Sequence, residues 1–216
     1  TFPYFRVDFC FRIGYSVFMI GDKQMATFVY IHGFNSAFTT ANPKVAALAT
    51  IGTVVGVTYD TLNTHEGCLD EIIAQLPTDL TDVILVGTSL GGYYAATVAA
   101  MLGLPSVLIN PSTIPGVSLS KYTGQSHTNY LTGDIGFFGK NTFSTYLGAR
   151  IRPNPRCLPL VAVDLADAVI PAGDTVDYFK AYGVMVNTFD GGSHQFDHMT
   201  DFLPMIAAYA NHVTYL

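Results

Sequence analysis

Hydrophobic residues along the chain form short continuous runs, and segments with helical spacing or helix-capping residues separate these runs. The runs typical of strands lie at 27–31, 53–59, 83–86, 106–109, 158–163 and 184–188. The segments with helix signals lie at 43–51, 66–76, 90–102, about 171–183 and in a last stretch that ends near 212. Continuous apolar runs are typical of strands that are buried on both faces. The sequence therefore predicts an α/β fold, with a mostly parallel central sheet and helices on both of its faces.

Two parts of the chain depart from this alternation. Residues 112–156 are rich in Gly, Ser, Thr and aromatic side chains and are too long for a plain connection, so we expect a loop excursion over the site. Residues 1–24 are apolar and aromatic but carry interrupting charges, which argues against a membrane-spanning helix. They form either a half-buried strand or a leader before Met25. We expect residues 25–216 to form a single domain.

Composition narrows the classes of partner. The chain has 216 residues, of which 12% are charged, and a net charge of −6 without any cluster of Lys and Arg. This charge pattern predicts no nucleic-acid partner. The apolar runs are too short to span a membrane, so we predict no membrane insertion. The three cysteines, Cys10, Cys68 and Cys157, form no CxxC pair, which favours a reducing compartment and a cytoplasmic location. Nothing in the sequence indicates the oligomeric state.

A Gly-x-Ser-x-Gly motif lies where a predicted strand becomes a predicted helix. Ser89 stands between Gly87 and Gly91, directly after the apolar run that ends at Val86. A tight turn of this kind strains the serine backbone and lifts its hydroxyl clear of the sheet, in the arrangement called the nucleophile elbow. The following helix N-terminus favours negative charge beside the hydroxyl. We predict that Ser89 is a nucleophile; the alternative is that it caps the helix.

A serine nucleophile needs a base, and the base needs an acid. His194 follows the last predicted strand in a Gly-Gly-Ser-His loop, which would bring it to the carboxyl edge of the sheet. His198 is expected to enter the last helix and to lie on its surface or behind the site. For the acid, Asp167 in the loop is preferred to Asp164 at the strand end, for which a turn or helix-capping role is expected.

Oxyanion donors and competing chemistries complete the prediction. The amide of Leu90, after the nucleophile, and that of Phe34, in the turn after the first strand, are the expected oxyanion hole.

A metal site is the first alternative, because His194 and His198 have i, i+4 spacing and two aspartates lie nearby. The pattern lacks the glutamate of His-Glu-x-x-His, so we predict no metal and no cofactor.

The order serine, aspartate, histidine along the chain is that of the α/β-hydrolases. Four segments resemble the small bacterial esterases of the YqiA-like branch of this superfamily: YIHGFNS at 30–36, GTSLGG at 87–92, INPS at 109–112 and GGSHQF at 191–196. The resemblance covers about 27–213 and implies an α/β-hydrolase fold, activity toward short acyl esters, no cofactor, and a triad of Ser89, Asp167 and His194. The loop from Asp164 to Asp167 lacks the glycine that the family usually has before the acid.

The sequence therefore predicts a serine hydrolase that acts on a small acyl ester through an acyl-serine intermediate. Ester, thioester and amide cleavage use the same machinery, so a thioesterase or an acyltransferase is the alternative within the enzymes. A catalytically idle binding module with the same fold is the alternative outside them. The physiological substrate and the acyl length are not encoded in these motifs.

Overall fold

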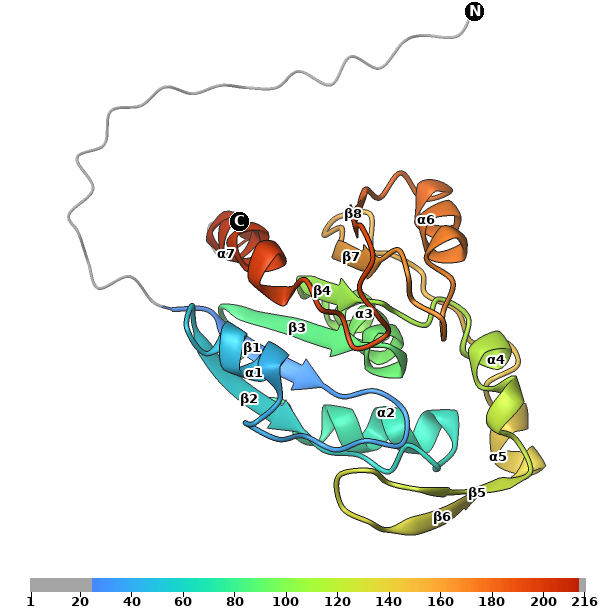
Figure 1. Ribbon diagram of the computed structural model, residues 1–216. Coiled ribbons are helices and arrows are strands. Elements are labelled where there is room, and N and C mark those ends of the chain that lie inside the picture. The colour runs from blue at the N-terminus through green and yellow to red at the C-terminus, as the bar shows by residue number, and fades with distance from the viewer. Residues whose placement is uncertain (1–24, 214–216) are drawn as a thin grey trace, which may run out of the picture.

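The computed structural model describes residues 25–213, so the predicted N-terminal extension over 1–24 lies outside the described residues. Within them, six strands form one sheet in the order β2-β1-β3-β4-β7-β8, and every neighbouring pair is parallel (Figure 1). The strands of this sheet are β1 (Thr27–Ile31), β2 (Thr53–Val57), β3 (Val83–Thr88), β4 (Ser106–Ile109), β7 (Leu160–Asp164) and β8 (Val186–Phe189). The predicted parallel α/β architecture is confirmed.

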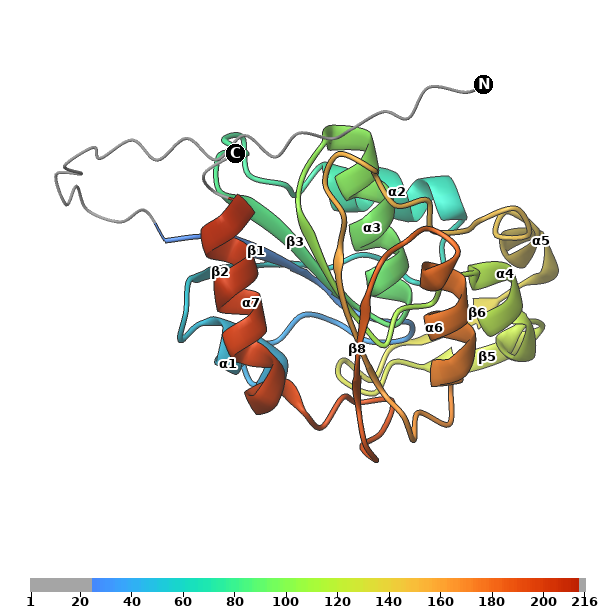
Figure 2. The same cartoon turned by 90° about the horizontal axis from the view of Figure 1, so that it is seen from above.

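Helices cover both faces of the sheet, as Figure 2 shows. On one face, α1 (Pro43–Leu48) and α7 (Met199–Val213) pack around a core that includes Phe28 and Phe202. On the other face, α2 (His65–Ile73), α3 (Leu90–Leu102) and α6 (Ala172–Lys180) contribute to a second core. Because the sheet is buried between these layers, its strands consist of continuous apolar runs.

The observed elements match the expected ones except at their ends. α1 ends at Leu48 and α2 ends at Ile73, earlier than the sequence pattern predicts. Beyond each end the chain continues in a tighter turn, with the Ile51 amide on the Leu48 carbonyl at 3.0 Å and the Leu76 amide on the Ile73 carbonyl at 3.2 Å. Such 3₁₀ turns often finish helices and keep a similar side-chain spacing, so the pattern runs past the α-helix.

Residues 112–156 form the expected excursion, but the excursion has secondary structure of its own. It contains α4 (Pro115–Ser118), the 3₁₀ helix η1 (Ser120–Tyr122), an antiparallel hairpin of β5 (Gln125–Thr128) and β6 (Ile135–Phe138), and α5 (Lys140–Ser144). The hairpin is largely exposed, so it lacks the hydrophobic alternation that would predict it. Phe138 and Tyr146 are fully buried and join the core beside α2 and α3.

The connections after β1 and β3 leave the sheet in opposite directions. From β1 the chain crosses to β2, which lies at one edge of the sheet. From β3 it crosses to β4, which lies toward the other edge. In open α/β sheets such a switch point creates a crevice beyond the carboxyl ends of the two strands. His32 follows β1 and Ser89 follows β3, so the two turns singled out in the sequence lie on either side of this crevice.

Candidate active site

Ser89 occupies a strained turn between β3 and α3. Its backbone angles are φ 57° and ψ −123°, which an L-residue rarely adopts and which cost about 1–3 kcal/mol. Main-chain hydrogen bonds hold this geometry: the Ser89 amide donates to Ile109 at 3.1 Å, and its carbonyl accepts from Gly92, Tyr93 and Ser112. The Ser89 side chain makes no capping hydrogen bond to α3. The hydroxyl is therefore free for another partner.

The two glycines of the motif allow the turn to approach its neighbours closely. A Cβ atom on Gly91 would collide with the carbonyl oxygens of Ile31 and His32 at the end of β1. A Cβ atom on Gly87 would collide with the main chain of Gly91. Both positions therefore require glycine for steric reasons, and this contact brings the start of α3 against the turn after β1.

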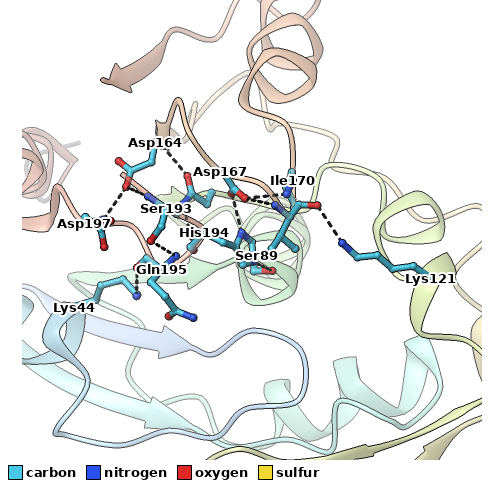
Figure 3. A network of polar contacts seen from close by, with 12 residues as sticks. Lys44, Ser89, Lys121, Asp164, Asp167, Ile170, Ser193, His194, Gln195 and Asp197 are labelled. Carbon is cyan, nitrogen blue, oxygen red and sulfur yellow. Dashed lines mark hydrogen bonds and ion pairs between the residues drawn. The ribbon is translucent and has the colours of Figure 1, made fainter. Parts of the chain in front are cut away.

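Three side chains from distant parts of the chain form one line of contacts (Figure 3). His194 Nε2 lies 3.0 Å from Ser89 Oγ, and His194 Nδ1 lies 2.7 Å from Asp167 Oδ2. The other oxygen of Asp167 accepts the amides of Val169 and Ile170 at 2.8 and 2.9 Å. The Asp167 side chain is 1% exposed, so these bonds fix it in the orientation that faces His194. The structure thus brings together Ser89, His194 and Asp167.

Asp164 does not contact His194. It ends β7 and is fully buried, and its carboxylate accepts the amides of Ser193 at 3.1 Å and Asp197 at 2.7 Å. Its other oxygen lies 2.8 Å from His198 Nδ1. This corrects the expected role in a turn or helix cap, because the side chain instead anchors both ends of the loop that carries His194.

Asn110 is a further positioning residue, which lies in the INPS segment but was assigned no role from the sequence. It is 1% exposed and has a φ of 43°, in the left-handed region that asparagine tolerates better than most residues. Its Nδ2 donates to the carbonyls of Ser193 and His194 at 2.9 and 3.3 Å, and its Oδ1 accepts the Asp164 amide at 2.9 Å. An asparagine directly after a buried strand was the available signal.

The turn after β1 packs directly on Ser89. A Cβ atom on Gly33 would lie 3.2 Å from Ser89 Cβ, so little space separates the two turns. The Phe34 ring stacks on Tyr122 of the excursion, with ring centroids 5.0 Å apart. Leu90 is the first residue of α3, so its amide has no acceptor within the helix. The two predicted oxyanion donors, Phe34 and Leu90, therefore lie on the two segments that flank Ser89.

His32 supports this turn and is not placed as a base. Its Nδ1 lies 2.9 Å from the Gly33 carbonyl, and its Nε2 accepts the Tyr59 amide at 3.4 Å. Burial lowers the pKa of His32 to about 4, so the ring is neutral near pH 7. With both nitrogens occupied, the ring holds the turn in place.

A cavity of about 150 Å³ opens at Ser89 and His194. Phe34 and Leu90 line it together with excursion residues such as Leu119 and Tyr122. The excursion therefore covers part of the crevice, as the sequence predicts, and leaves a small, partly open cavity in front of the serine hydroxyl.

His198 lies just before α7, and not inside it as the sequence suggests. Its ring stacks on Phe189 at a centroid distance of 5.3 Å. The hydrogen bond to Asp164 raises the pKa of His198 above its usual value. An interaction that raises the pKa of a histidine also stabilises the folded state. This contribution is fully present below the pKa of the unfolded state, about 6.5, and is lost as the pH rises through the pKa of the folded state.

We therefore expect His198→Gln to lower the free energy of unfolding more near pH 5.5 than near pH 9, each compared with wild type. Phe189→Leu removes the stacking partner but keeps the pair with Asp164, so its loss should change less between the two pH values than that of His198→Gln. Urea unfolding followed by circular dichroism measures all three proteins. Equal losses for His198→Gln at the two pH values would show that protonation of His198 beside Asp164 adds nothing to stability.

The histidines of the metal alternative face different partners. His194 pairs with Asp167, whereas His198 pairs with Asp164. Within residues 25–213, no three His, Cys, Asp or Glu side chains gather closely enough to hold a metal ion. Over the same range, no helix has the length and apolarity needed to cross a membrane.

Sequence comparison identifies the family. The model described as "Uncharacterised protein family (UPF0227)" matches residues 27–211, which is most of the chain. The chain belongs to the UPF0227 family. UPF0227 proteins from Shewanella woodyi and Shewanella sediminis are 36% and 35% identical to it over 92 residues, which are 40% of this chain and 51% of each relative. The chain thus spans about half the length of the curated relatives that it matches.

Solved structures similar to this UPF0227 chain include proteins described as α/β-hydrolases. Alpha/beta hydrolase domain-containing protein 10 from mouse has a TM-score of 0.64 and 15% identity, covering 87% of this chain and 88% of its own. Est1E from Butyrivibrio proteoclasticus has a TM-score of 0.62 and 18% identity, covering 88% and 87%. At such identities the likeness concerns the fold. The expected α/β-hydrolase fold is confirmed, and the family model places the chain in UPF0227.

Proposed function

We propose that this UPF0227 chain is a serine hydrolase that cleaves short carboxylic esters. The observation that carries the proposal is the line of contacts from Ser89 Oγ to His194 at 3.0 Å and from His194 to Asp167 at 2.7 Å. A serine hydroxyl is a weak nucleophile, and a base within hydrogen-bond reach activates it. The strained turn that presents Ser89 supports the same role.

The mechanism follows from these positions. Ser89 Oγ attacks the acyl carbonyl while His194 Nε2 takes its proton, and Asp167 keeps the other imidazole proton on Nδ1. The amides of Leu90 and Phe34 donate to the oxyanion. His194 then protonates the leaving alcohol. Finally His194 activates a water that attacks the acyl-serine and releases the acid.

An apolar groove adjoins the cavity at Ser89 and could hold the acyl chain of a substrate. It has a volume of about 300 Å³ and shares Ser118, Val169 and Ile170 with the cavity at Ser89. Val117 and Tyr178 add to its walls. Among the structural neighbours, the thermophilic esterase Est2 from Thermogutta terrifontis is described with butyrate bound; it has a TM-score of 0.56 and 16% identity, covering 89% of this chain and 85% of its own. We infer that the groove accepts the acyl chain of a carboxylic ester.

A fluorophosphonate probe, which labels activated serines, tests this proposal. The wild-type protein should be labelled, and Ser89→Ala should not. Ser120→Ala is a matched control, because Ser120 is an exposed serine whose hydroxyl donates to Val117 outside the cavity. We expect this control to be labelled like wild type. Equal labelling of Ser89→Ala, or no labelling of wild type, would contradict the proposal and favour a non-catalytic binding module.

A panel of esters that differ in acyl length then tests the substrate class. Each ester is assayed with wild type and with Ser89→Ala as background. We expect the highest kcat/KM for short acyl oxoesters, because the cavity at Ser89 has a volume of only about 150 Å³. Higher kcat/KM for the matched thioesters would instead indicate a thioesterase or acyltransferase that uses the same residues.

A further inference from the structure

Lys44 is a buried lysine in the wall of the cavity that contains Ser89. It lies in the first turn of α1 and is 5% exposed. Its Nζ donates to the Gln195 carbonyl at 2.6 Å, one residue after His194. An ammonium group has three donors, so this bond leaves two of them for another partner.

No carboxylate neutralises Lys44 by direct contact. The two ion pairs within residues 25–213 join histidine to aspartate, and neither includes Lys44. Asp164 already accepts three hydrogen bonds from the histidine loop, and Asp197 is exposed. A buried ammonium without a paired charge is costly. Asp197 and Asp164 favour the charged form of Lys44 from a distance, but burial outweighs them and lowers the pKa of the ammonium. An anion that enters the cavity would supply a direct partner.

Lys44 lies where the cavity at Ser89 meets a second hollow. This hollow has a volume of about 610 Å³ and shares Ser36, Asn42, Lys44, Tyr130 and Gln195 with the smaller cavity. Figure 3 shows Lys44 next to Gln195, and Ile170 next to Asp167 and Ser89. The buried cation therefore contacts the loop that carries His194, and the apolar groove begins at Ile170.

The role of His194 decides which half of the substrate reaches Lys44. His194 protonates the leaving alcohol in the proposed mechanism, so the alcohol lies beside the histidine loop. Lys44 is bonded to Gln195 of that same loop, whereas Ile170 opens the groove assigned to the acyl chain.

We propose that the preferred substrate is an ester whose alcohol carries a carboxylate, and that Lys44 binds this carboxylate. The proposal rests on the proposed ester hydrolysis. One ammonium in a small cavity matches the single charge of a carboxylate, whereas a phosphate dianion would need more donors.

Two acetate esters of the same shape test the proposal: 4-carboxyphenyl acetate and 4-carbamoylphenyl acetate, which differ in the charge of the alcohol. Lys44→Met should lower kcat/KM for the carboxylate ester about 10- to 100-fold more than for the carbamoyl ester. Lys44→Arg should restore part of this difference, because it keeps the charge. Equal losses on both esters would mean that Lys44 only holds the histidine loop, and would overturn the proposal.

A binding measurement separates this proposal from ester hydrolysis itself. 4-Hydroxybenzoate, the product of the charged ester, is titrated into Ser89→Ala and into Ser89→Ala with Lys44→Met. Affinity about tenfold or more weaker in the double variant supports the Lys44 site even when no ester is hydrolysed. Equal affinity in the two proteins, or no binding to either, would overturn it. Failure of fluorophosphonate labelling contradicts the proposed hydrolysis, whereas this binding measurement tests the carboxylate site at Lys44 by itself.

Discussion

His194→Ala should lower kcat for ester hydrolysis about 10⁴- to 10⁶-fold, with the fold retained. The loss is large because His194 Nε2 lies 3.0 Å from Ser89 Oγ, and no other histidine bonds to Ser89 within the described residues. The imidazole is 21% exposed, so its removal leaves no large buried cavity. Steady-state kinetics, with circular dichroism as a check on folding, measures the effect.

His198→Ala is the matched control, because His198 also pairs with an aspartate but does not reach Ser89. It should lower kcat by no more than about tenfold. The two aspartates should differ in a similar way. Asp167→Asn should lower kcat strongly and the free energy of unfolding only slightly, whereas Asp164→Asn should lower both. Activity that survives in His194→Ala but is lost in His198→Ala would show that the base is wrongly assigned.

Gly91→Ala should lower the free energy of unfolding by about 3 kcal/mol or more. The added methyl group would collide with the main-chain carbonyls of Ile31 and His32, and backbone atoms at the end of a central strand cannot move aside cheaply. The reorganised turn should also displace Ser89, so residual folded protein should lose fluorophosphonate labelling. Thermal and urea unfolding measure the loss of stability.

Gly173→Ala provides the control for this substitution. Gly173 lies in α6, and no atom lies within 4 Å of the Cβ that alanine would add. Alanine is the better helix former, so this change should leave stability unchanged or raise it by up to about 1 kcal/mol. A similar small effect for Gly91→Ala would mean that the close approach between α3 and β1 is not required for folding.

Several features were predictable because local patterns encode them. A strand buried on both faces must be continuously apolar, and this requirement marks β1, β3 and β4 in the sequence. The turn at Ser89 needs small neighbours on both sides, so glycines mark it. The exposed hairpin of the excursion lacks such a mark, because Ile135 and Phe137 face solvent at 74% and 61% exposure.

The sequence by itself determined the α/β alternation, the turn at Ser89 and the order of serine, aspartate and histidine, because each depends on neighbouring residues. Only the tertiary structure decided that Asp167, and not Asp164, meets His194, and that Asn110 holds the histidine loop. It alone also placed Lys44 in the wall of the cavity. These contacts join segments that are distant in the chain, and the order of strands in the sheet sets their distances.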